Sequence, residues 1–95
     1  MAVSTIGKNS FGNWGSASSS FPFTAPTDGF VYAMFNPSTG DGYQYVVLNV
    51  GPVAVKLLTA GGGLTHGIFP VKAGETVSIG SNTGGAVTHR FRSIW

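Results

Sequence analysis

The fold is decided by the stretch FPFTAPTDGFVYAMF, residues 21–35, which predicts a strand, a corner and a second strand. Phe21 and Phe23 alternate with small or polar neighbours, which is the period of a half-buried strand. Pro22 has no N–H group to donate to a neighbouring strand, so we expect the first strand at the edge of a sheet. Residues 25–29 supply the corner, because Pro fixes φ, Asp can bond its own backbone and Gly allows positive φ.

Residues 30–35 place aromatic, β-branched and long aliphatic side chains on both faces of the second strand. A strand that is apolar on both faces must be covered on both faces. One face can pack against the second sheet of a sandwich. The other face needs a further cover, and an identical neighbouring subunit is the simplest candidate.

The composition indicates a small all-β domain with few surface charges. The chain has 95 residues, enough for one domain, and 15 of them are Gly. Charged residues make up 8% of the sequence, against roughly 25% in an ordinary globular domain. A small domain with so little surface charge tends to associate unless partners cover part of it, so we expect a homo-oligomer.

The charge balance and the missing residue types argue against several functional classes. The net charge is +2, but five Lys and Arg make a weak case for nucleic acid, which needs a clustered basic face. There is no Cys for a disulfide or a thiolate metal site. No apolar run approaches the roughly 18 residues of a membrane span. Residues 1–15 lack a signal peptide pattern, so we expect neither membrane insertion nor a signal peptide.

The chain is expected to divide into an N-terminal arm or linker, residues 1–19, and a head domain, residues 20–95. The arm is rich in Ser, Gly and Asn. Phe11 and Trp14 indicate that part of the arm docks on a surface, and the edge of the same domain is the preferred one.

The head domain is expected to hold seven antiparallel strands, since turn signals recur every 8–12 residues or so and no segment shows helix periodicity. After the first two strands, the pattern predicts strands over residues 43–50, 53–60, 64–71, 76–81 and 86–95. The side chains predicted to be largely buried are Phe23, Phe30, Tyr32, Met34, Val47, Val55, Val77, Ile79 and Phe91.

Two short motifs resemble a known family. Residues 23–32, FTAPTDGFVY, are similar to the corner and first core strand of small trimeric jelly-roll domains at the C-termini of bacteriophage tail fibres, head fibres and receptor-binding proteins. Residues 70–77, PVKAGETV, resemble a later hairpin of the same domains. Their architecture is similar to that of C1q and tumour-necrosis-factor heads. The resemblance covers residues 20–95, and it departs from C1q itself because the chain is shorter and no collagen-like segment precedes it.

The resemblance implies an antiparallel β-sandwich of the C1q/TNF-like jelly-roll type that assembles as a homotrimer. It implies a non-enzymatic virion protein, a fibre or receptor-binding head that recognises a host-surface ligand, with a glycan preferred. The expected location is the virion, which is released by lysis without a signal peptide. Two alternatives stay open: a structural trimerisation or capsid-decoration module without a ligand, and a small nucleic-acid-binding β-barrel.

The predicted ligand site is the loop of residues 36–42 and the residue that follows it. The loop is long for a hairpin connection, and Asn36 and Asp41 can bond sugar hydroxyls. Tyr43 can offer a ring face to a pyranose. In a trimer the loop would recur three times around one end, so that weak sites gain avidity. The other interpretation is that these are ordinary loop-forming residues.

No catalytic site, metal site or cofactor is predicted. Asp28, Asp41 and Glu75 each adjoin a turn glycine, so turn formation is the preferred role of all three carboxylates. His66 and His89 are far apart in the sequence, and they would hold a metal only if a three-fold axis brought three copies of one together.

The last strand carries two basic residues and a terminal aromatic residue. Arg90 and Arg92 share one of its faces, which is interpreted as solvated, with an anionic ligand as the alternative. Trp95 is expected to pack in the core or at a subunit interface.

Overall fold

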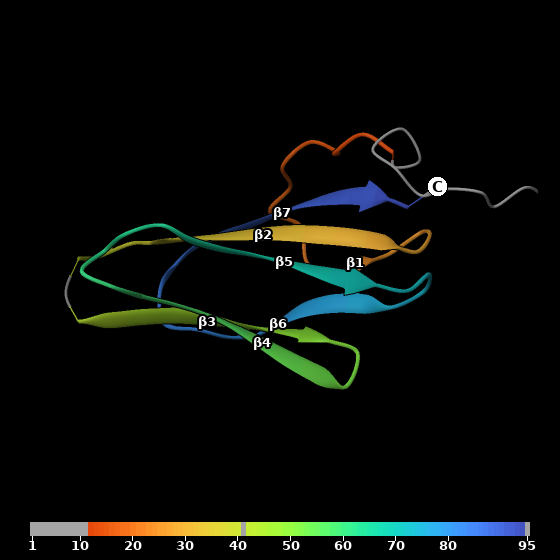
Figure 1. Cartoon of the computed structure of the whole chain (residues 1–95). Helices are drawn as coiled ribbons and strands as arrows, with labels where there is room; N and C mark the ends of the chain where they lie inside the picture. Colours follow the sequence, from red (N-terminus) through yellow and green to blue (C-terminus); the bar gives the residue numbers. More distant parts are fainter. Residues whose placement is uncertain (1–11, 41, 95) are drawn as a thin grey trace, which may run out of the picture.

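The computed structural model describes residues 12–40 and 42–94, and within them the chain is all-β and antiparallel, without helices. Phe11, Asp41 and Trp95, for which the sequence suggested roles, lie outside the described residues. The strands, labelled in Figure 1, are β1 (Phe23–Thr24), β2 (Gly29–Pro37), β3 (Tyr43–Val50), β4 (Val53–Ala60), β5 (Thr65–Val71), β6 (Thr76–Asn82) and β7 (Gly85–Ser93).

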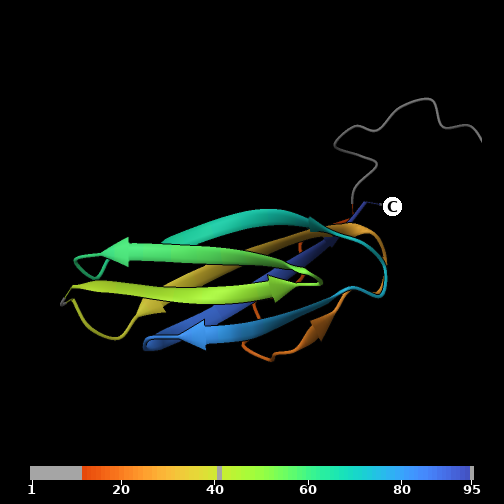
Figure 2. The same cartoon turned by 90° about the horizontal axis from the view of Figure 1, so that it is seen from below.

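The strands form a four-stranded sheet in the order β1-β6-β3-β4 and a three-stranded sheet in the order β5-β2-β7. The sheets lie face to face, as Figures 1 and 2 show from two directions. The hairpin between β3 and β4 stays within one sheet, whereas the other connections cross between the sheets. β1 lies at a sheet edge, which confirms the expectation drawn from Pro22.

Turn signals in the sequence located the strands well. The bounds of β3 and β4 coincide with the predicted ranges 43–50 and 53–60, because Gly and Pro punctuate the chain on both sides. β5 and β6 agree with their predicted ranges to within one residue at each end. β1 is shorter than predicted and forms only two cross-strand pairs with β6.

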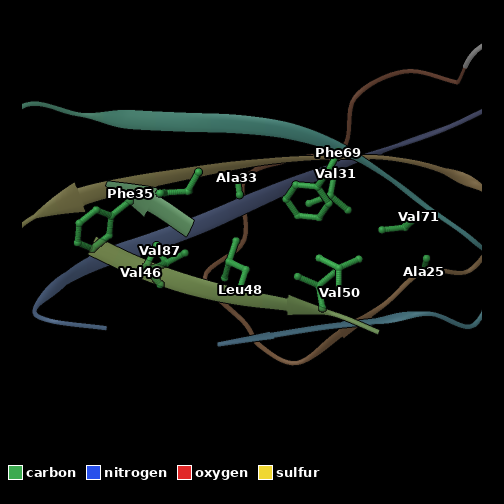
Figure 3. Packing of buried hydrophobic residues seen from close by; sticks show 12 residues of the cluster. Ala25, Val31, Ala33, Phe35, Val46, Leu48, Val50, Phe69, Val71 and Val87 are labelled. Carbon is green, nitrogen blue, oxygen red and sulfur yellow. The ribbon is translucent and has the colours of Figure 1, made fainter. Parts of the chain in front are cut away.

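The core lies between the sheets and is built from alternate residues of both (Figure 3). Phe35, Leu48, Val31, Val46 and Val77 are the largest side chains that are fully buried. The other members of the cluster are Ala25, Ala33, Val50, Leu57, Phe69, Val71 and Val87. Fully burying a side chain such as Val or Leu contributes about 1.5–3 kcal/mol, so this single cluster is the main source of stability.

The prediction of buried residues was wrong about which face of β2 points inward. Phe30, Tyr32 and Met34 lie on the outer face and are half-buried, whereas the alternate residues of β2 are fully buried. The alternation of an all-apolar strand cannot distinguish its faces. The cross-strand register distinguishes the two faces, because Tyr32 pairs with the exposed Arg90 and paired residues share a face.

Two further burial predictions were wrong, and the remaining four were right or partly right. Val47 is only half-buried because it pairs with Lys56 on the outer face of the four-stranded sheet. Ile79 is 39% exposed, because β1 ends its pairing with β6 at Val77 and leaves the rest of β6 as an edge. Val77 is buried as predicted. The other three predicted residues pack, half-buried, against the core: Phe23, Val55 and Phe91.

The two motifs that carry the family resemblance are hydrogen-bonded to each other. Ala25, in the β1–β2 corner, donates its N–H to the Glu75 carbonyl at 2.9 Å and accepts the Gly74 N–H at 2.8 Å. The Asp28 carboxylate of the same corner accepts the Ala73 N–H at 2.9 Å. Ala25 is buried beneath these bonds. The corner and the β5–β6 turn therefore form one rigid end of the domain.

The β5–β6 turn has the chemistry that the sequence predicted. The Glu75 N–H bonds the Lys72 carbonyl at 3.0 Å, and Gly74 has a φ of 84° at the third position. This is the geometry of a type II turn, which requires positive φ at that position. Glu75 also accepts the Lys72 N–H through its carboxylate at 3.1 Å.

Gly29 allows β2 to pass close to β7, and we predict that Gly29→Ala is strongly destabilising. A Cβ at this position would overlap the Arg92 carbonyl oxygen and lie 2.7 Å from Cζ of Phe91. Relieving such overpacking costs about 2–3 kcal/mol, which urea denaturation will measure. The control is Gly63→Ala, whose new Cβ would lie 3.7 Å from Thr59 Oγ1, an ordinary contact. Equal stabilities of the two variants would contradict the prediction.

Candidate functional site

Residues 12–18 of the predicted arm run along the outer edge of β7 (Figure 1). The N–H groups of Gly12 and Gly15 donate to β7 carbonyls at 2.8 Å each. Ser18 and His89 exchange two backbone bonds of 2.8 and 2.9 Å. This part of the arm therefore docks on the edge of its own domain, the surface that the sequence analysis preferred.

Trp14 turns from the arm onto the outer face of the three-stranded sheet. Its ring meets the Tyr32 ring edge-on, with centroids 6.3 Å apart. The Arg92 guanidinium lies 5.2 Å from the Trp14 ring centroid and donates to the Gly12 carbonyl at 2.8 Å. A guanidinium over an indole is a favourable cation–π pair, so the arm and the sheet hold each other in place.

The outer face of the three-stranded sheet is called the aromatic face below. Cross-strand pairing arranges it in three rows, each running from β5 through β2 to β7: Pro70, Phe30 and Arg92; Ile68, Tyr32 and Arg90; His66, Met34 and Thr88. Ile68 is 61% exposed, and the three β2 residues are only half-buried. The result is an apolar centre with arginines along the β7 side.

Tyr32 is the centre of the aromatic face. Its hydroxyl lies 3.2 Å from Nδ1 of His66, within hydrogen-bonding distance. Tyr32 also lines an open hollow of about 460 Å³ together with Trp14, Ile68 and Arg90. Arg90 donates to the Gly15 carbonyl at 3.3 Å and is otherwise exposed. The hollow thus combines two aromatic rings, an aliphatic side chain and a cation.

The predicted ligand residues lie at the end of the molecule where β2 passes to β3. β2 and β3 belong to different sheets, so the loop crosses between sheets and does not close a hairpin. Asn36 is exposed near the end of β2, and Tyr43, the first residue of β3, is 74% exposed. By strand alternation Asn36 lies on the side of the aromatic face and Tyr43 on the outer face of the other sheet. Asp41 lies outside the described residues.

The ionisable residues considered for catalysis or metal binding are dispersed in the structure. No group of three His, Cys, Asp or Glu that could hold a metal ion occurs among residues 12–40 and 42–94. His66 is exposed on the aromatic face, whereas His89 is buried in the interior. The Asp28 and Glu75 carboxylates each accept a backbone N–H at a turn, which agrees with turn formation.

Sequence analysis missed the aromatic face as a surface, although it recognised that β2 is apolar on both sides. A usable signal was present in the last strand, where Arg90 and Arg92 share one face. Residues of a neighbouring strand that pair with these two arginines lie on the same face of the sheet, outside the core. The missing information was which strand pairs with β7.

Comparison of the chain with models of known protein families gives no match, and comparison with curated proteins and with solved structures gives none either. Across the part of the chain that the structure describes, no helix is long and apolar enough to cross a membrane.

His89 is an ionisable side chain in an aromatic environment. Its ring centroid lies 4.8 Å from that of Phe21 and 4.6 Å from that of Phe23. Within the described residues its Nδ1 is buried without a hydrogen-bond partner. Desolvation by burial lowers the pKa of His89 below its ordinary value of 6.5, so the folded protein holds this ring neutral at pH 7.

We predict that acidification destabilises the fold through His89. As the pH falls below 6.5, the unfolded chain binds a proton at this residue that the folded chain does not, so the free energy of unfolding falls. His89→Gln removes this dependence, and its thermal midpoint should change less between pH 7.5 and 5.5 than that of the wild type. His66→Gln, which alters the exposed histidine, is the control for a histidine substitution as such. Parallel curves for wild type and His89→Gln would refute the assignment.

Proposed function

We propose that the chain is the non-enzymatic head of a bacteriophage fibre or receptor-binding protein, a homotrimeric jelly roll that binds a host-surface glycan. The observation that carries this proposal is the hydrogen bonding between the β1–β2 corner and the β5–β6 turn. These are the two motifs that resemble the phage domains, and they lie about fifty residues apart in the chain. Their contact gives a structural reason for the two motifs to occur together.

The strand connections support the jelly-roll part of the proposal. Jelly rolls are double-sheet structures built from Greek-key connections, in which the chain passes repeatedly from one sheet to the other. Here the chain crosses between sheets at each connection other than the β3–β4 hairpin. The arm adds backbone bonds along β7, so it extends the three-stranded sheet in the manner of a further strand.

The aromatic face supports the trimer. Phe30, Tyr32 and Met34 form a continuous apolar column along β2, flanked by the exposed Ile68. Such a face is unusual on a monomer unless a partner covers it. A second copy of the chain is the partner that a homotrimer provides, and a stable contact buries on the order of 800 Å² per partner.

A structural module without a ligand remains the alternative, since trimerisation alone also explains the aromatic face. Screening the trimer against a saccharide array decides between the two functions. A nucleic-acid-binding function is the third candidate, because aromatic and basic side chains on a sheet can stack and hold single strands. It requires DNA or RNA binding that weakens steeply with salt.

The trimer prediction is tested by changing the aromatic face at its most exposed apolar position. Ile68→Lys places a positive charge opposite Tyr32 and in the same row as Arg90, where a neighbouring subunit would exclude water. Light scattering at micromolar concentration should then return the chain mass of 9.8 kDa, while the wild type returns three times that mass. The matched control is Leu58→Lys, at a 50% exposed position on the outer face of the other sheet. A monomeric wild type, or a control that dissociates equally, would count against this interface.

The ligand prediction concerns the end of the domain where β2 passes to β3. Changing Asn36, Asp41 and Tyr43 together to Ala removes the polar and aromatic groups proposed to contact a sugar. Because Asn36 and Tyr43 are exposed, the trimer mass should be unchanged, while adsorption to the host surface falls at least tenfold, as expected for linked weak sites. Undiminished adsorption by an intact trimer would place the binding site elsewhere.

A further inference from the structure

The aromatic face carries cationic side chains on its β7 side. Arg90 and Arg92 lie there, paired with Tyr32 and Phe30 of β2. Within residues 12–40 and 42–94 the carboxylates are Asp28 and Glu75, and both are bonded to backbone N–H groups at the β5–β6 turn. Of the described residues, Arg90 thus brings to this face a positive charge that is complementary to an anion.

Arg90 is the residue of this face best placed to hold one. It pairs with Tyr32 in the β2–β7 register and forms one wall of the hollow described above. A guanidinium has five N–H donors in a planar fork, which matches the oxygens of a carboxylate, sulfate or phosphate. One of these nitrogens bonds the Gly15 carbonyl at 3.3 Å, which fixes the group beside the hollow.

Covering this face with a second subunit makes a counter-ion necessary. Arg does not lose its proton in proteins, so Arg90 would carry its charge into the interface. Moving a charge from water into an interface is strongly unfavourable when no oppositely charged group accompanies it. A small oxyanion in the hollow would neutralise it and bond the groups around it.

We infer that the hollow lined by Trp14, Tyr32, Ile68 and Arg90 is an oxyanion site whose occupation stabilises the trimer. The inference rests on the proposed trimer and on the aromatic face as its interface. The volume of about 460 Å³ lies within the range of small-molecule sites. The hollow admits either an inorganic oxyanion or the carboxylate of an acidic sugar, and both present negatively charged oxygens to Arg90.

The test measures the protein concentration at which half of the trimer dissociates, by mass photometry on a dilution series. Ionic strength is held constant while chloride is replaced by millimolar sulfate, by glucuronate, or by chloride with glucose as the uncharged control. The wild type should dissociate at about tenfold lower concentration with an oxyanion, a typical coupling between two binding events. A shift with sulfate identifies a free inorganic ion as sufficient, and a shift with glucuronate alone identifies an acidic sugar.

Variants separate this site from general salt effects, since sulfate strengthens apolar association in many proteins. Arg90→Met keeps the aliphatic stem and should lose the oxyanion shift. Arg90→Lys keeps the charge without the planar fork and should retain a smaller shift. Lys56→Met removes a cation from the opposite sheet, where it lies 4.3 Å from the Tyr45 ring centroid, and should retain the full shift.

Two negative outcomes are distinguishable. A trimer whose dissociation is the same in every anion, or whose shift persists in Arg90→Met, overturns the oxyanion site and leaves the proposed function intact. A monomer mass in all conditions overturns the trimer and, with it, the inference.

Discussion

The contact between the β1–β2 corner and the β5–β6 turn is the constraint on which the rest of the domain depends. Ala25 gives and receives a backbone bond there, and the Asp28 carboxylate adds a third bond. These bonds join a segment entering the three-stranded sheet to one entering the four-stranded sheet. They therefore set the relative position of the two sheets at this end, and the buried cluster fills the space between them.

The second constraint is that β2 is central in its sheet and apolar on both faces. Its inner residues complete the core, and Gly29 lets it approach β7 closely. Its outer residues are only half covered, although Trp14 reaches across from the arm to Tyr32. The same strand thus links the stability of one chain to the proposed assembly of several chains.

Local chemistry in the sequence was sufficient to predict the strands, because Gly, Pro and Asp end them at short intervals. The β3–β4 hairpin is the clearest case, since the Gly51-Pro52 step separates two strands with the predicted bounds. The inner face of β2 could not be predicted, because it depends on pairing with Arg90 at long range. The predicted loop, residues 36–42, overlaps the connection between β2 and β3, but Asn36 and Pro37 belong to β2. The sequence could not show that these strands lie in different sheets, with Asn36 and Tyr43 on different outer faces, because this depends on the topology alone.

The arm along β7 also determines how the domain would respond to a pulling force. A load applied to the chain ahead of residue 12 reaches the head first through the backbone bonds between the arm and β7. Pulled along the strand axis, these bonds share the load and must break together. Pulled away from the sheet, they open one at a time, beginning at Gly12. The bonded arm therefore resists a force along the strand axis better than a force away from the sheet. The direction of pulling relative to the arm would decide how firmly such a head stays attached under tension.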